Sequence, residues 1–122
     1  MSEMMNPENI VSNVHIDSNG CFKYVLIRIH KEGSASEFIV RGYSWAAYHA
    51  DIYDSAEEEL AKLGYETECL GGGRILHDSV NKTIKVYGYS MGFGLADHSK
   101  TCELLKIKYP DYTSISWTNE GY

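Results

Sequence analysis

Residues 88–92 of this 122-residue chain read Gly-Tyr-Ser-Met-Gly, a pattern that could place a catalytic nucleophile on a tight turn. The spacing fits G-x-S-x-G, in which Ser90 would stand between a strand and a helix. An α/β-hydrolase sheet needs more chain than this and a parallel β-α alternation that the sequence lacks. A serine hydrolase at Ser90 is therefore a weak alternative. We expect the turn instead to offer backbone N–H groups to an anion at the start of a helix.

Cysteine chemistry is disfavoured by both spacing and number. Four residues separate Cys69 from Arg74, one fewer than a cysteine phosphatase loop requires, and the sequence predicts a strand rather than a pKa-lowering helix after them. We expect Cys69 to be a small buried apolar residue. The chain has three cysteines and no C-x-x-C pair, so neither a zinc ribbon nor a secreted disulfide scaffold is predicted.

The histidines do not form a recognisable metal site. His49 and Asp51 lie two residues apart on a predicted helix, and side chains at that spacing point to different faces. His77 and His98 are isolated in the sequence, and we expect them at the surface or at caps. The sequence therefore predicts no metal and no cofactor.

One group of residues remains that could hold a small anion beside a base. His49 falls in the first turn or so of a helix, where the positive end of the helix dipole favours the neutral ring. Three basic residues, Lys23, Arg41 and Arg74, lie at strand ends or beside the triple glycine, and the turn 90–92 offers further donors. A histidine simply packed in the core is the alternative for His49 at this stage.

The elements that must position these groups follow from hydrophobic periodicity and turn residues. Ser44 is the expected N-cap of the first helix, and Gly64 fits its C-terminal end. The predicted strands are 14–16, 22–30, 37–43, 65–69, 74–80, 83–90 and 113–117, and the predicted helices are 44–63 and 95–109. This order predicts an α+β fold, with a loose N-terminal tail at 1–13 and a single domain at 14–122.

The formal net charge of −6, from 11 basic and 17 acidic residues, disfavours a nucleic-acid or anionic-membrane partner. No signal peptide or apolar run of membrane-spanning length is predicted, so we expect a cytoplasmic protein. Five of the acids fall between Asp51 and Glu59 on one exposed helix side. Any anion site is therefore expected to be small, about one phosphoryl group wide.

Six blocks in order carry a resemblance far more specific than any short motif. They are Gly-Cys-Phe-Lys-Tyr-Val-Leu-Ile-Arg at 20–28, Ile-Val-Arg-Gly-Tyr at 39–43 with Trp45, Tyr-His-Ala-Asp-Ile-Tyr at 48–53, Glu-Cys-Leu-Gly-Gly-Gly-Arg-Ile at 68–75, Val-Tyr-Gly-Tyr-Ser-Met-Gly at 86–92, and Lys-Tyr-Pro-Asp-Tyr at 108–112. Across about residues 14–122 the chain resembles the phosphohistidine phosphatase (Janus) family.

The resemblance implies a metal-independent phosphatase acting on phosphohistidine in proteins, with a six-stranded, largely antiparallel mixed sheet and two helices. It implies His49 as the proton acceptor and Lys23 as a substrate-binding residue. The other implied substrate-binding residues are Ser90, Met91 and Gly92 at the phosphate, and Arg41 and Arg74 along the cleft.

Two positions depart from the family pattern. Ser44 stands where members often carry lysine, which removes a positive charge near the site, and Gly92 stands where alanine is common. Neither change removes a catalytic group. A non-catalytic module that binds phosphorylated ligands in the same site is the main alternative function, and we expect a monomer in either case.

Overall fold

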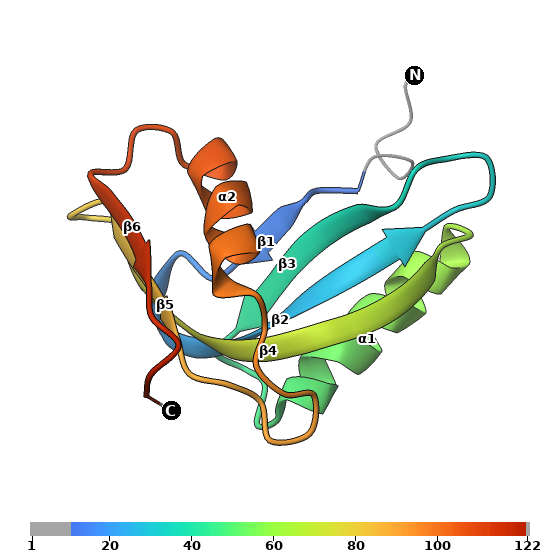
Figure 1. Cartoon of the computed structure of the whole chain (residues 1–122), viewed down its shortest axis with the longest axis horizontal. Helices are drawn as coiled ribbons and strands as arrows, with labels where there is room; N and C mark the ends of the chain where they lie inside the picture. Colours follow the sequence, from blue (N-terminus) through green and yellow to red (C-terminus); the bar gives the residue numbers. More distant parts are fainter. Residues whose placement is uncertain (1–10, 122) are drawn as a thin grey trace.

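The computed structural model describes residues 11–121, which form one six-stranded sheet with a helix on each face (Figure 1). The elements in chain order are β1 (Val14–Ile16), β2 (Asn19–His30), β3 (Glu37–Tyr43), α1 (His49–Lys62), β4 (Glu66–Asp78), β5 (Thr83–Tyr87), α2 (His98–Lys108) and β6 (Ser114–Trp117). The predicted α+β class is confirmed. None of the helices in this part of the chain is long and apolar enough to cross a membrane.

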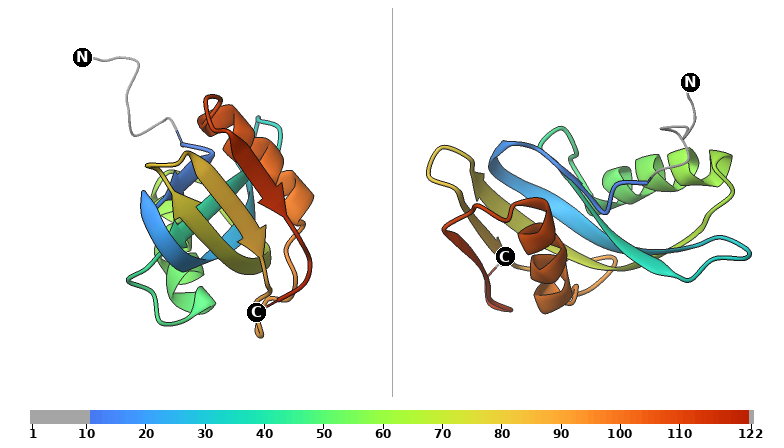
Figure 2. Two further views of the ribbon diagram at one scale, coloured as in Figure 1. Left: turned by 90° about the vertical axis from the view of Figure 1, so that its left-hand side faces the viewer. Right: turned by 90° about the horizontal axis from the view of Figure 1, so that it is seen from above.

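The strands lie in the order β1-β3-β2-β4-β5-β6. The two outer pairs, β1 with β3 and β5 with β6, are parallel, and the inner pairs are antiparallel. The sheet is therefore mixed and largely antiparallel, as expected. Figure 2 shows α1 and α2 on opposite sides of it.

Strand β2 is central and apolar on both faces. Val25, Ile27 and Ile29 are buried in a core that includes apolar residues of α1. Tyr24 and Leu26 point the other way, into a core shared with α2. Burial of each large side chain stabilises the fold by about 1.5–3 kcal/mol, so the sheet is held from both faces.

Strand β4 corrects the prediction of two strands broken at the triple glycine. It runs without interruption from Glu66 to Asp78 and pairs with β2 along its length. The irregularity is a bulge, because Leu26 pairs with Gly71 while Ile27 pairs with Cys69. The long partner strand β2 keeps the glycines extended, an effect that local propensity does not include.

The three glycines permit close contacts on both faces of β4. A methyl group built on Gly72 would lie 2.7 Å from His49 Cδ2, on the α1 side. One on Gly73 would lie 2.6 Å from His98 Cε1 and 2.5 Å from the Tyr87 carbonyl oxygen. Both helices therefore begin directly against strand backbone that carries no side chains.

The first helix begins later than predicted, and Ser44 is not its N-cap. The Ser44 N–H and hydroxyl both donate to Asp17 Oδ2 at 2.7 Å, which ties the loop after β3 to the end of β1. Tyr48 is the N-cap residue, and its N–H donates to Asp51 Oδ2 at 2.9 Å. Gly64, with a φ of 89°, follows the helix end as predicted.

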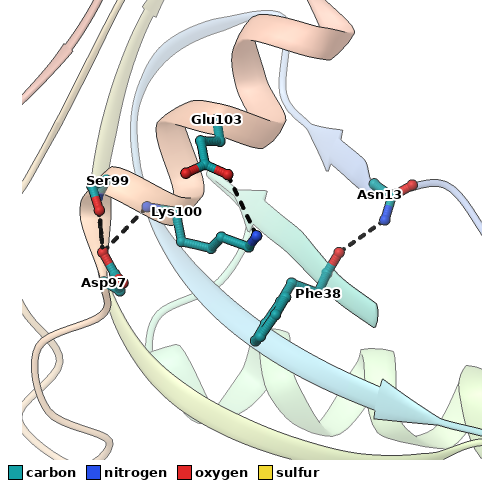
Figure 3. Close-up of polar contacts among 6 residues, drawn as sticks. All are labelled: Asn13, Phe38, Asp97, Ser99, Lys100 and Glu103. Carbon is teal, nitrogen blue, oxygen red and sulfur yellow. Dashed lines mark hydrogen bonds and ion pairs between the residues drawn. The ribbon is translucent and has the colours of Figure 1, made fainter. Parts of the chain in front are cut away.

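The second helix also begins later than predicted, at His98 rather than near Leu95. Asp97 is its N-cap, and its carboxylate accepts the N–H group of Ser99 at 3.1 Å. It also accepts the N–H group of Lys100 at 3.2 Å (Figure 3). An aspartate in this position satisfies donors that the first helical turn cannot pair internally. In the segment before it, Leu95 bridges Gly72 in the middle of β4.

We predict that Gly73→Ala destabilises the protein by about 1–3 kcal/mol or more, because the new methyl group meets a carbonyl oxygen and a buried imidazole. The check is urea unfolding followed by circular dichroism. Gly92→Ala is the matched control: a methyl group there meets nothing within 4 Å, so its effect should stay within about 0.5 kcal/mol. Equal stability of the two variants would contradict the packing described here.

Candidate functional site

A cavity of about 490 Å³ opens on the α1 side of the sheet and brings together six of the seven predicted site residues. The six are Lys23, His49, Arg74, Ser90, Met91 and Gly92. They come from β2, the start of α1, β4 and the loop between β5 and α2. The orange loop and the start of α1 approach each other at the bottom of Figure 1.

His49 is the first residue of α1 and is half-buried in this cavity. Its Nε2 lies 2.9 Å from the Gly73 carbonyl oxygen. Because a carbonyl oxygen only accepts, Nε2 carries the proton, and the neutral ring has its lone pair at Nδ1. The geometry thus fixes the tautomer and makes Nδ1 the basic atom.

The pKa of His49 is lowered below its ordinary value, chiefly because burial disfavours the charged ring. The hydrogen bond to Gly73 raises the pKa, and the positive charges of Lys23 and Arg74 lower it again. The net effect favours neutral imidazole near pH 7, the form that can accept a proton.

Lys23 and Arg74 occupy paired positions on the antiparallel strands β2 and β4, so both side chains lie on the same sheet face as His49. Within residues 11–121 no carboxylate forms an ion pair with Lys23. Two cations beside a neutral base make the cavity locally positive in an acidic protein. Charge-assisted hydrogen bonds from such groups suit a phosphoryl anion.

The loop carrying Ser90 differs from the prediction in two ways. It does not start a helix, since α2 begins only at His98. The Ser90 N–H is already donated to the Gly94 carbonyl oxygen at 3.0 Å, and the Gly94 N–H returns a bond of 2.8 Å. Within residues 11–121 the Gly92 N–H has no acceptor and remains available to a ligand.

Backbone N–H donors for an anion lie at the start of α1. The sequence pattern had placed them at the start of the second helix. Ala47, Tyr48 and Ala50 line the cavity with His49. The first N–H groups of a helix have no internal acceptor, and the helix dipole favours an anion there. The signal was the spacing of Tyr48 and Asp51, because an acid three residues after the N-cap is typical of a helix start.

Arg41 does not join this cavity. It is only 6% exposed, and its guanidinium donates to the backbone oxygens of Val40 and Ser12 at 2.9 and 2.8 Å. It lines a separate cavity of about 720 Å³ with Tyr43 and Glu59. The structure gives Arg41 a role in fixing the chain before β1 against β3.

The nucleophile alternatives find little support in the local geometry. Ser90 is 2% exposed, its hydroxyl accepts the Phe93 N–H at 3.1 Å, and no histidine of the described residues is hydrogen-bonded to it. Cys69 is half-buried against the α1-side core, and burial raises the pKa of its thiol. A reactive thiol requires the opposite shift.

His77 and His98 were expected at the surface or at caps; both are buried, although His98 directly follows the N-cap residue of α2. His77 is buried and hydrogen-bonded to the Asp17 carbonyl oxygen and the Tyr112 hydroxyl. His98 is buried at the start of α2. Among residues 11–121 there is no group of three or more His, Cys, Asp or Glu side chains that could hold a metal ion.

The exposed acids of α1 lie beyond its first turn, whereas Asp51 in that turn binds the Tyr48 N–H. Asp54, Glu57 and Glu58 are exposed, while the start of the helix faces Lys23 and Arg74. The exposed acids of α1 are thus separated along the helix from the two cations of the cavity.

We predict that Lys23→Met raises the pKa of His49, because the substitution removes a positive charge that opposes imidazolium formation. An NMR titration of the imidazole signals measures the pKa directly. Lys31→Met, just past the far end of β2 and beside the Tyr65 ring, is the control and should leave the pKa of His49 in place. An unchanged pKa in Lys23→Met would show that Lys23 does not act on the ring.

Comparisons with known proteins agree with the sequence blocks. The family model described as Janus/Ocnus matches residues 8–113. The 14 kDa phosphohistidine phosphatase of Sus scrofa is 54% identical over 118 residues, which cover 92% of this chain and 93% of the relative. The Homo sapiens protein of the same name is 52% identical over 119 residues, covering 93% and 94%.

A third relative is the sex-regulated protein janus-A of Drosophila yakuba, which is 54% identical over 109 residues. The match covers 89% of this chain and 80% of that protein. The family match covers most of the chain and the relatives are matched at more than half of the aligned positions, so the chain belongs to the Janus/Ocnus family.

Proposed function

We propose that this protein is a phosphatase that hydrolyses the P–N bond of phosphohistidine in proteins, without a metal ion, with His49 as general base. One observation carries the proposal: the His49 ring is held through Nε2 on Gly73, with basic Nδ1 left over, in a cavity that also contains Lys23 and Arg74. The names of the two mammalian relatives support the choice of phosphohistidine as substrate.

Binding of the phosphoryl group uses the positive side of the cavity. Lys23 and Arg74 pair with the phosphoryl oxygens, supported by the first N–H groups of α1 and by the Gly92 N–H. We include Ser90 and Met91 as residues that shape this loop around the phosphate. Arg41 acts at most indirectly, since it lies in the other cavity.

In the chemical step a water molecule attacks phosphorus in line with the P–N bond. His49 Nδ1 takes a proton from that water as the new P–O bond forms. The P–N bond breaks, its electron pair goes to the substrate imidazole nitrogen, and solvent supplies the proton that this nitrogen needs. The imidazolium formed at His49 strengthens its Nε2–H bond to the Gly73 oxygen.

Substrate binding also prepares the base. In the free protein Lys23 and Arg74 lower the pKa of His49. A bound phosphoryl group carries negative charge beside both cations and offsets this effect, so Nδ1 becomes more basic when substrate is present. The site is thereby tuned to ionise in the complex rather than in the free protein.

The same nitrogen supports a second route, in which Nδ1 attacks phosphorus directly and forms a phospho-His49 intermediate. Water then hydrolyses the new P–N bond and restores the ring. Acid-labile label on enzyme trapped with radioactive substrate, absent in His49→Ala, would identify this route. Absence of label in the wild-type protein during turnover supports direct attack by water.

The setting we propose is the cytoplasm, with the protein acting as a monomer on phosphohistidine-containing proteins. The net charge of −6 disfavours nucleic acid and anionic membranes as partners. The exposed acids of α1 also disfavour contact between a large polyanion and the helix beside the cavity.

We predict that His49→Ala lowers phosphohistidine phosphatase activity by about 10²–10⁴-fold, the usual contribution of a general base. The assay measures phosphate release from a phosphohistidine peptide, with a chelator present throughout. His30→Ala, at the exposed end of β2, is the control and should retain wild-type activity. Near-full activity of His49→Ala, or loss of wild-type activity on chelation, would contradict the proposal. Phosphate release at catalytic enzyme concentrations excludes the binding-module alternative.

A pH prediction follows from the lowered pKa of His49. The protonated ring is inactive as a base, so kcat/KM should rise with pH through the free-protein pKa, below about 6.5, and then level off. The corresponding rise of kcat should lie at higher pH than the rise of kcat/KM, because the bound phosphoryl group raises the pKa of His49. The opposite order of the two limbs in a steady-state pH profile would contradict this account.

A further inference from the structure

We propose that His98 is a positioning residue for His49, acting through Gly73 and Gly88 from the opposite face of the sheet. His98 is 1% exposed and takes no direct part in the chemistry described above. The effect that we expect of His98 on catalytic rate rests on the proposed function. The effect of His98 on the geometry of His49 does not.

For a neutral ring, the hydrogen bonds of His98 have one consistent set of proton positions. Nε2 lies 2.8 Å from the Gly88 carbonyl oxygen and must donate to it. Nδ1 of the neutral ring then accepts from the Tyr24 hydroxyl at 2.6 Å, and Tyr24 accepts from the Thr101 hydroxyl at 3.0 Å. Burial lowers the pKa of His98, which favours this neutral form. The ring is therefore held at both nitrogens.

The same ring lies directly against Gly73. A methyl group on Gly73 would be 2.6 Å from His98 Cε1, so the imidazole edge occupies the space that a side chain would take. Gly73 also pairs with Tyr24 across the β2–β4 ladder, and Tyr24 bonds the ring. The Gly73 peptide is thus packed by His98 on one face, and its carbonyl oxygen orients His49 on the other.

The Gly88 bond links His98 to the phosphate loop. Gly88 has a φ of 73°, follows strand β5, and is separated only by Tyr89 from Ser90. Holding its carbonyl oxygen fixes the direction in which the loop leaves the sheet. One buried side chain therefore contacts both backbone segments that shape the cavity.

The start of α2 is fixed well enough to hold His98 in place. Figure 3 shows the Asp97 carboxylate bonded to the Ser99 hydroxyl, at 2.6 Å, and to the Lys100 N–H. Lys100 Nζ lies 3.4 Å from Glu103 and 4.9 Å from the centroid of the Phe38 ring. Just before the cap, the Ala96 N–H donates to the Gly72 oxygen at 3.1 Å. These interactions anchor the helix start to β3 and β4.

The test compares His98→Ala with His98→Gln and with Leu105→Ala in the full chain. Leu105 is fully buried on the same helix and belongs to the α2-side core. Leu105→Ala should therefore lower stability, as His98→Ala does, without removing the contacts of His98 with Gly73 and Gly88. The glutamine amide can replace the donor at Nε2. Each variant is assayed at a temperature where unfolding measurements show it folded.

We expect kcat on a phosphohistidine peptide to fall by about 10–100-fold in His98→Ala, since displacing a catalytic group by about 1 Å costs up to that order. It should recover in part in His98→Gln and stay near wild type in Leu105→Ala. Long-range ¹H–¹⁵N NMR should show the His49 ring as the Nε2–H tautomer in the wild type and as a tautomer mixture in His98→Ala.

Wild-type kcat and tautomer in His98→Ala would overturn the proposal, as would equal losses in His98→Ala and Leu105→Ala at equal stability. If the wild-type protein releases no phosphate, the proposed function fails, and the NMR comparison alone decides the role of His98. An unshifted His49 signal then counts against it, and a tautomer mixture counts for it.

Discussion

The absence of side chains at three successive residues of β4 is the constraint on which the rest of this structure depends. Gly71, Gly72 and Gly73 leave bare backbone at the centre of the sheet, and both helices begin against it. Because Gly73 can offer its carbonyl oxygen to His49 while the His98 ring packs against its other face, one peptide unit serves both helices. Any side chain there would separate the base from its anchor, so the conformational penalty of glycine in a strand is offset by close packing.

Much of the fold could be predicted because it rests on periodicity. The alternation along β2 determined which residues face each core, and β3 was predicted with the bounds that the structure has. The errors occurred where a distant partner decides. Ser44 is not a helix N-cap because it is hydrogen-bonded to Asp17. Strand β4 continues through its glycines because it pairs with β2. Such long-range partners leave no local signal in a single sequence.

The candidate site was predictable in composition and less so in detail. Lys23 and Arg74 meet because strand pairing places them opposite each other, and His49 joins them from the helix start. Arg41 looked equivalent in the sequence, yet burial and two backbone acceptors hold it elsewhere. The Gly94 oxygen that occupies the Ser90 N–H, and the burial of His98, depend on loop and helix packing that no spacing pattern encodes.

The separation of charge along α1 has a consequence for encounter with a substrate. Exposed acids occupy the middle of the helix, whereas its first turn lies beside two cations. Under the proposed function, an approaching anionic partner would be repelled by the exposed acids of α1 and attracted by Lys23 and Arg74 at the cavity, which would favour an approach with its phosphoryl group first. Ionic strength therefore acts on orientation as well as on attraction, and added salt weakens the guidance that this acidic protein gives to an anion.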